Sequence, residues 1–249
     1  MNNKFINITI LVLLTVFILF RINTALNQMN SDDEQVSQSI EDLPAVFSGV
    51  MPCADCPGIE TVIVLNETGF EELSHYQERE SNLYQAEGTW SLSGDTLKLY
   101  RSEDELYKAF IFSREQIKQL DQDLQPITGV LEENYVLDRS QEQESIRSRH
   151  SELQDEGINF LASGNEPFWS VHINFDGQLL YKTPGSETPY PFSEFEEIVE
   201  NQSTIYSADK MQITITAGYC RDTMSGFLFT HRVEIQTNGQ NMTGCGRYL

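Results

Sequence analysis

Short segments of alternating apolar and polar residues run through most of the chain. Between residues 44 and 138 they are ETVIVLN (60–66), GTWSLS (88–93), DTLKLYR (95–101) and ELYKAFIFS (105–113). Turn-forming stretches separate them, such as NETG at 66–69 and Gly94-Asp95. A period of two is typical of half-buried strands, and no long helical period interrupts it. This block therefore predicts an antiparallel barrel or sandwich.

Residues 158–249 show the same pattern. Their alternating segments are FWSVHINF (168–175), QLLYKT (178–183), KMQITITAG (210–218) and FTHRVEIQ (229–236). Asp176-Gly177 and Asn238-Gly239 are strong hairpin signals. The two blocks show no convincing internal repeat. We therefore predict an all-β protein with two small antiparallel β domains, 44–138 and 158–249.

The remaining segments predict export and tethering. Lys4 precedes an apolar run of roughly 22 Å in helical form, which suits a signal peptide better than a ~30 Å membrane span. Because the cleavage site is poor, residues 1–27 are either a cleaved signal or an uncleaved anchor, and no cysteine follows the run as a lipid acceptor. Residues 28–43 are predicted to be a polar tether. Residues 139–157 are predicted to be an acidic polar linker, which could form a short exposed helix but buries nothing.

The charge balance limits the class of partner. The chain has 16 basic and 38 acidic residues, for a net charge of −22. Such a chain repels phosphate backbones and anionic lipid surfaces. We therefore exclude nucleic acid as a partner and expect membrane contact only through the N-terminal segment. The 39% of apolar residues is enough to form cores.

The four cysteines fall into two pairs, and oxidation is expected outside the cytoplasm. Cys220 and Cys245 enclose a predicted hairpin, so a disulfide between them would staple the second domain. Cys53 and Cys56 support three chemistries. We favour a disulfide at a tight turn; a weak, open Cu(I) site with Met51 is the first alternative. A redox pair is the second, disfavoured because a β-rich run follows where a helix is needed.

No local motif predicts catalysis. The four histidines lie outside any G-x-S-x-G or H-E-x-x-H setting, and the acidic run EFEEIVE (194–200) reads as a solvated face. We expect neither catalytic residues nor a resident cofactor, apart from weak copper. Phe168 and Trp169 point to opposite faces if the chain is extended there. Core packing is the favoured interpretation for them, and an exposed contact surface is the alternative.

Two stretches of the first block resemble a known family. GVMPCADCPGIET (49–61) and EGTWSLSGDTLKL (87–99) are similar to motifs of the NlpE family of copper-resistance and envelope-stress lipoproteins. The resemblance implies a lipocalin-like barrel in the bacterial envelope. It also implies a non-enzymatic signal to an inner-membrane sensor kinase. Only Cys53 and Cys56 correspond to that motif's cysteines.

The second block resembles a different family. GNEPFW (164–169), CRDTMS (220–225) and GCG (244–246) are similar to motifs of an uncharacterised family of bacterial envelope domains. This resemblance implies a location and no activity.

These observations lead to one hypothesis and two alternatives. We expect an exported, non-enzymatic protein on the periplasmic side of the envelope, either anchored in the inner membrane or released. It would act in copper tolerance or envelope-stress sensing by binding an envelope protein, such as a membrane sensor. The first alternative is a lipocalin-like carrier of a small apolar ligand. The second is a thiol oxidoreductase that uses Cys53 and Cys56.

Overall fold

The computed structural model describes residues 40, 42–79, 83–176, 178–191, 194–237 and 239–249. The predicted signal segment 1–27 and nearly all of the predicted tether 28–43 lie outside the described residues. Within these ranges, no helix is both long and apolar enough to cross a membrane.

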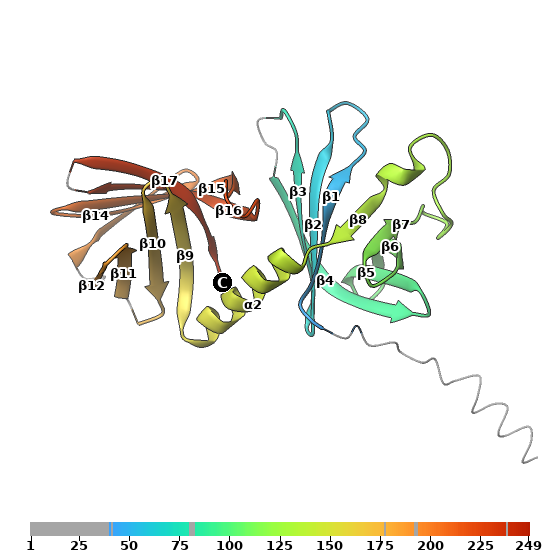
Figure 1. Cartoon of the computed structure of the whole chain (residues 1–249), viewed down its shortest axis with the longest axis horizontal. Coiled ribbons are helices and arrows are strands. Elements are labelled where there is room, and N and C mark those ends of the chain that lie inside the picture. Colours follow the sequence, from blue (N-terminus) through green and yellow to red (C-terminus); the bar gives the residue numbers. More distant parts are fainter. Residues whose placement is uncertain (1–39, 41, 80–82, 177, 192–193, 238) are drawn as a thin grey trace, which may run out of the picture. The chain divides into compact units, whose positions relative to one another are not determined.

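The first domain is a closed barrel of eight antiparallel strands, connected in chain order (Figure 1). β1 pairs with β8 to close it. This up-and-down arrangement is that of lipocalin-like barrels and confirms the predicted fold class. The strands are β1 (Ala45–Met51), β2 (Ile59–Asn66), β3 (Gly69–Tyr76), β4 (Leu83–Ser93), β5 (Thr96–Ser102), β6 (Glu105–Phe112), β7 (Gln116–Gln119) and β8 (Val136–Arg139).

The barrel interior changes character along its axis. Alternation along β2 places Ile63 and Leu65 on the same side as Thr61, which lines an internal cavity. Fully buried apolar side chains fill the other part of the barrel, and they are Phe47, Ile63, Leu65, Leu97, Leu99, Phe110, Ile117 and Leu137. The hypothesis of a carrier for an apolar ligand expects a hollow apolar interior, and this part is filled by the protein itself.

A short 3-10 helix, η1 (Glu132–Asn134), precedes β8, and α2 (Gln141–Asp155) follows it. The Ser140 side chain caps α2 by accepting a hydrogen bond from the Gln143 amide at 3.4 Å. The helix buries Arg147, His150 and Leu153, three residues apart on one face. The expectation that residues 139–157 bury nothing is therefore wrong, because two of the three buried side chains are polar and leave no apolar stripe in the sequence.

The second domain is one nine-stranded antiparallel sheet in the order β12-β11-β10-β9-β17-β16-β15-β14-β13. Both predicted hairpins are present, because β10 pairs with β11 and β16 pairs with β17. The strands are β9 (Ile158–Asn165), β10 (Phe168–Asn174), β11 (Gln178–Thr183), β12 (Ser186–Pro191), β13 (Glu196–Glu200), β14 (Ser203–Ala208), β15 (Met211–Arg221), β16 (Leu228–Thr237) and β17 (Gln240–Tyr248).

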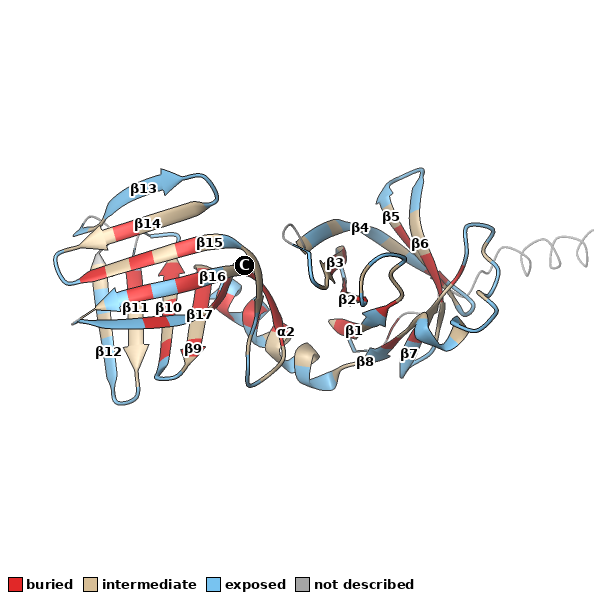
Figure 2. Cartoon of the chain, turned by 90° about the horizontal axis from the view of Figure 1, so that it is seen from above, coloured by how far each residue is buried: buried red, intermediate tan, exposed pale blue. Residues whose placement is uncertain are grey.

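The core of the second domain lies on one face of this sheet. Alternate residues of β15 and β16 are buried there, including Ile213, Ile215, Val233 and Ile235, and Figure 2 shows these strands with buried positions in red. The edge strand β13 is exposed along its whole length, which agrees with a solvated face for the acidic run.

Candidate functional site

The Cys53–Cys56 disulfide closes the loop between β1 and β2. β1 ends at Met51 and β2 begins at Ile59, so the loop is a short bend between two paired strands. Asp55 in the loop forms an ion pair with Arg79. The Gly58 carbonyl accepts a hydrogen bond from the Gln77 amide at 3.1 Å. The loop is thus fastened to the end of β3 as well as to its own strands.

The loop geometry bears on the two other chemistries considered for Cys53 and Cys56, which are thiol redox catalysis and metal binding. Strand β2, and not a helix, follows Cys56, so no helix dipole is present to lower the thiol pKa for redox catalysis. A closed disulfide offers no thiolate to a metal ion. Among the described residues, no three His, Cys, Asp or Glu side chains are grouped so as to hold one. Cu(I) binding by Cys53, Cys56 and Met51 stays a prediction, and it applies to the reduced protein.

Met51, the third residue of the predicted Cu(I) site, lies at the end of β1. It is 6% exposed and lines an internal cavity of about 340 Å³ in the barrel. Most of the cavity lining is polar or aromatic and comes from strands β1 to β7 and the loops around them, including Thr61, Ser74, Tyr76, Tyr107 and Tyr135. The cavity therefore begins next to the disulfide loop and continues into the barrel.

The cavity contains a buried carboxylate, that of Glu72 on β3, which is 2% exposed. Its Oε1 accepts hydrogen bonds from Lys108 Nζ at 2.7 Å, Ser74 Oγ at 2.7 Å and Tyr107 Oη at 3.2 Å. Burial, followed by the negative charge of Glu72, raises the pKa of the Tyr107 phenol. Tyr107 consequently stays protonated and is a permanent donor to Glu72.

Sequence reasoning missed Glu72. Alternation along GFEELSHY (69–76) places it between Phe70 and Ser74 on the inward side, which is a usable signal. The pair Glu71-Glu72 obscures that signal, because two adjacent carboxylates look like a solvated turn. Its partner Lys108 lies 36 residues away in sequence, so only the fold brings the two charges together.

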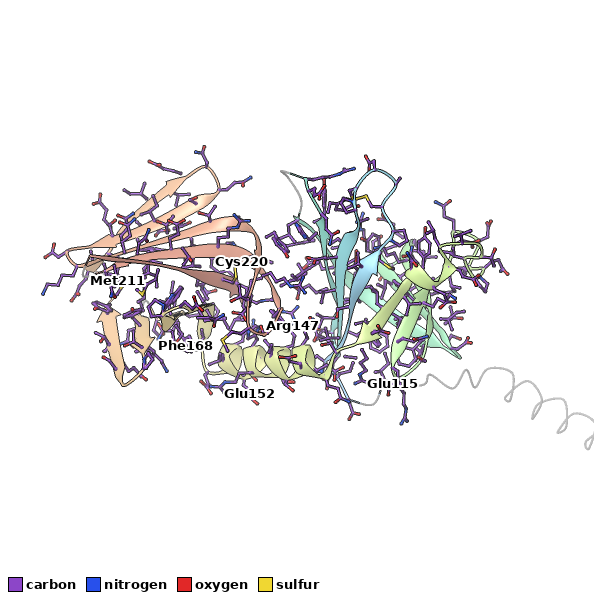
Figure 3. All side chains as sticks on the ribbon, turned by 45° about the horizontal axis from the view of Figure 1, so that its top comes forward. Glu115, Arg147, Glu152, Phe168, Met211 and Cys220 are labelled. Atoms are coloured by element: carbon purple, nitrogen blue, oxygen red, sulfur yellow. A yellow bond between two sulfur atoms is a disulfide. The ribbon has the colours of Figure 1, made fainter. Side chains whose placement is uncertain are left out.

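In the second domain, the three motif segments come together. The Cys220–Cys245 disulfide is present in the predicted pairing and joins β15 to β17 (Figure 3). Asn165 Nδ2 donates to Asp222 Oδ2 at 2.8 Å, which links the first motif to the second. Gly244 of the third motif lies against Trp169, where an added Cβ would be 2.7 Å from Cζ2 of the indole.

Asp222 has a structural role. Its Oδ1 accepts the Met224 amide at 3.0 Å, the Ser225 amide at 2.7 Å and the Ser225 hydroxyl at 2.8 Å. Burial alone would raise its pKa, but the hydrogen bonds from Ser225, Asn165 and Met224 outweigh burial and lower the pKa. With both oxygens engaged, the carboxylate holds the loop between β15 and β16 in place, and this explains the motif without any reaction.

The side chains of Phe168 and Trp169 lie on opposite faces of the sheet, as alternation along a strand requires. Phe168 is 55% exposed (Figure 3), whereas Trp169 is 3% exposed and belongs to the core. Burial of Trp169 agrees with core packing for that residue. A contact surface at the exposed Phe168 stays a prediction.

The histidines of the second half are largely buried. His172 on β10 and His231 on β16 both have lowered pKa values, with burial as the main cause. His150 on α2 packs against Phe227 and Phe229, and burial lowers its pKa to about 4. These side chains are neutral at physiological pH, as expected for packing residues.

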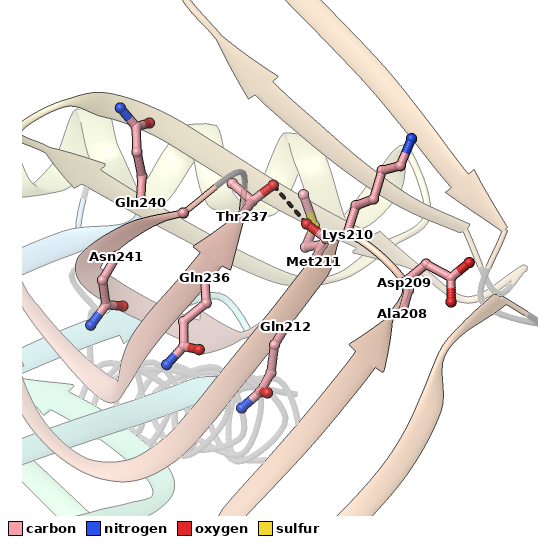
Figure 4. A pocket seen from close by; sticks show the side chains of 10 residues that line it. Ala208, Asp209, Lys210, Met211, Gln212, Gln236, Thr237, Gln240 and Asn241 are labelled. Atoms are coloured by element: carbon pink, nitrogen blue, oxygen red, sulfur yellow. Dashed lines mark hydrogen bonds between the residues drawn. The ribbon is translucent and has the colours of Figure 1, made fainter.

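A polar groove of about 600 Å³ lies at the ends of two hairpins in the second domain (Figure 4). Amide side chains line much of it, including Gln212, Gln236 and Asn241, and the Thr237 hydroxyl donates to the Lys210 carbonyl at 3.0 Å. Hydrogen bonding is the chemistry that this groove offers.

Comparison with known proteins gives a family match within the first domain. Residues 47–130 match the family model described as the NlpE N-terminal domain. Lipoprotein NlpE of Escherichia coli K12 is 29% identical over 140 residues, which cover 54% of this chain and 56% of that protein. The chain thus matches little more than half the length of this relative.

Two solved structures are also similar. A candidate lipoprotein from Shewanella oneidensis is 30% identical, with a TM-score of 0.35, and covers 40% of this chain and 91% of its own. The E. coli Cpx pathway activator NlpE is 16% identical, with a TM-score of 0.32, and covers 84% of this chain and 96% of its own.

The assignment rests on the sequence matches. The family model stops at residue 130, so the resemblance of residues 158–249 to an uncharacterised envelope family stays a prediction. Over the barrel, the family match and the C-x-x-C loop agree with the resemblance inferred from the motifs. Residues 47–130 of the first domain are therefore similar to the NlpE N-terminal domain family, whose model they match.

Proposed function

We propose that this protein is an exported envelope protein of the copper or envelope-stress response and that it works by binding rather than by turnover. The match of residues 47–130 to the NlpE N-terminal domain, with a C-x-x-C pair in an exposed β1–β2 loop, carries this proposal. The copper and stress roles come from the family resemblance. The proposed location is the periplasmic side of the envelope.

The proposed switch is the Cys53–Cys56 disulfide. A thiol reductant supplies two electrons and two protons, so the S–S bond breaks and two thiols form, while the reductant becomes a disulfide. Cu(I) then displaces the two thiol protons and binds both thiolates. Soft sulfur ligands favour Cu(I) over harder ions. The oxidised and reduced loops thus present different surfaces to a partner.

The strand next to the loop is suited to carry this change. β1 pairs with β2 along its whole length, from Ala45↔Leu65 to Met51↔Ile59. Its pairing with β8 comprises only Phe47↔Arg139 and Ser48↔Asp138. Opening the loop would loosen the end of β1 where it has one neighbour, and a strand edge of this kind can dock an extended segment of an envelope partner.

The test is a Cu(I) competition assay on the reduced full-length protein, using a colorimetric Cu(I) chelator. Wild type and Cys53→Ser/Cys56→Ser are compared. Both keep Cys220 and Cys245, so any binding by that pair is common to the two proteins. We expect the double variant to lose at least about tenfold in affinity, because both thiolates become hard hydroxyl oxygens and the Met51 thioether is the one soft ligand of the proposed set that remains.

Two methionine variants complete the assay. Met224 is 68% exposed in the second domain, so Met224→Leu is a surface control and should bind as wild type does. Met51→Leu measures the thioether contribution. A double serine variant that binds Cu(I) as tightly as wild type would rule out the metal-binding form of the proposal.

A further inference from the structure

The unusual feature of the barrel is an unsatisfied oxygen on a buried charge. The Oε1 atom of Glu72 has three donors, but Oε2 is buried and has no hydrogen-bond partner in the described part of the chain. A buried carboxylate oxygen without a donor is costly, and buried polar groups in folded proteins are nearly always paired. Because Glu72 lines the cavity, a molecule in the cavity can supply the missing donor.

The size of the cavity is that of a small-molecule site. Its volume of about 340 Å³ lies in the range of ligand pockets, roughly 300 to 1,000 Å³. At the rim, Tyr84 is 54% exposed and meets Tyr76 edge-to-face, with 5.0 Å between the ring centroids. These rings offer flat apolar faces next to the polar wall formed by Thr61 and Ser74.

Charge decides the class of ligand. The Lys108 ammonium already compensates the Glu72 carboxylate, with 2.7 Å between Nζ and Oε1. The Arg101 guanidinium lies 4.1 Å from the centroid of the Tyr107 ring and also lines the cavity. A cationic ligand would be repelled by both basic groups. An apolar ligand would leave Oε2 unpaired and desolvate the polar wall. A neutral hydroxyl or amide N–H satisfies Oε2 without adding charge.

We propose that the first domain binds a small uncharged molecule with hydroxyl and amide donors, of the size of an N-acetylated monosaccharide. One donor pairs with Glu72 Oε2, and an apolar face of the molecule lies against Tyr76 and Tyr84. No cysteine lines this site, although Met51, the proposed thioether ligand of the sulfur switch, does. The site replaces the apolar cargo expected for a lipocalin-like carrier with a polar one.

The experiment is calorimetric titration of the full-length protein with N-acetylglucosamine as the probe and decanoate as the apolar comparison. We expect saturable binding of N-acetylglucosamine with a Kd of about 1 mM or tighter, and none of decanoate. Glu72→Gln replaces an acceptor oxygen with a donor group, so affinity should fall by at least roughly tenfold. Glu67→Gln, in the exposed β2–β3 turn, is the matched control and should bind as wild type does.

A second variant keeps the proposal testable even if Glu72→Gln does not fold. Tyr84→Ala removes an exposed rim ring and should weaken binding several-fold while unfolding at the same urea concentration as wild type. Absence of saturable binding of N-acetylglucosamine to wild type overturns the proposal. Unchanged binding by both Glu72→Gln and Tyr84→Ala, or binding of decanoate alone, also overturns it.

Discussion

Removal of the Cys220–Cys245 disulfide should destabilise the second domain far more than removal of Cys53–Cys56 destabilises the first. The two bonds differ in the length of chain that they close, with sequence separations of 25 and 3. A cross-link stabilises a fold mainly by restricting the unfolded chain, and this effect grows with loop length. The perturbations are Cys220→Ala/Cys245→Ala and Cys53→Ala/Cys56→Ala.

The expected magnitudes follow from the loop-entropy relation. It gives about 3.5 kcal/mol for the longer loop and about 1.6 kcal/mol for the shorter one. The first value is a large part of the ~5 to 15 kcal/mol that stabilises a typical domain. The Cys245 side chain is also 5% exposed and packs with Phe227 and Phe229, so its truncation adds to the loss.

The two tryptophans allow each domain to be followed separately. Trp90 lies on β4 of the barrel, and Trp169 lies in the core of the second domain. In a Trp90→Phe background, fluorescence during urea unfolding reports Trp169 alone. With an m-value of about 1.5 kcal/mol/M, loss of the Cys220–Cys245 bond should lower the midpoint by about 2 M urea.

The Cys53→Ala/Cys56→Ala pair is the control, and it should leave the Trp169 transition in place. A midpoint shift well below about 1 M for the Cys220/Cys245 variant would refute the loop-entropy reasoning. Equal shifts of the Trp169 transition for the two variants would refute it as well.

Three further predictions concern helix α2 and the second domain. Gly164→Ala adds a Cβ 2.6 Å from Cε2 of the Trp169 indole, so thermal unfolding should show a loss of about 2 kcal/mol or more. Burial lowers the His150 pKa from 6.5 to about 4, so its neutral form stabilises the fold above pH 6.5 and this contribution is lost as pH falls from 6.5 toward 4. The free energy of unfolding, measured by urea denaturation, should therefore fall by on the order of 1 to 3 kcal/mol between neutral pH and about pH 5. The fall should be smaller in His150→Gln. Asp222→Ala removes four hydrogen bonds around the β15–β16 loop and should cost about 2 to 4 kcal/mol by chemical denaturation, whereas Asp209→Ala, in the β14–β15 turn, should cost little.

Several strands could be predicted because one of their faces is buried and the other is more exposed. KMQITITAG shows this clearly, since Met211, Ile213 and Ile215 are buried and the residues between them are not. β3 was harder, because it carries a buried glutamate where an apolar residue is expected. The pattern therefore predicted a barrel or sandwich, the family resemblance implied the barrel, and neither predicted the polar cavity within it.

Helix α2 shows a second limit of the sequence. Its buried face consists of Arg147, His150 and Leu153, of which only Leu153 is apolar. The aromatic partners of His150, Phe227 and Phe229, come from the second domain more than seventy positions later. Periodicity cannot indicate a buried face whose residues are polar, so the segment looked like a solvated linker.

The disulfide pairing could be favoured from the sequence, whereas the sequence did not say which of Phe168 and Trp169 is buried. Four cysteines allow three pairings, and the short spacing of Cys53 and Cys56 favours the observed one without fixing it. Alternation says that Phe168 and Trp169 face opposite ways but not which side is the core. Gly164 and Gly244 carried that signal, because both make room for the Trp169 indole.

The account depends most on the resting state of the two sulfurs in the β1–β2 loop. The direct measurement is alkylation of free thiols in the protein taken from its native envelope, with mass spectrometry before and after a reductant is added. We predict that Cys53 and Cys56 stay unlabelled until the reductant opens their bond. Labelling of both residues without any reductant would contradict the account.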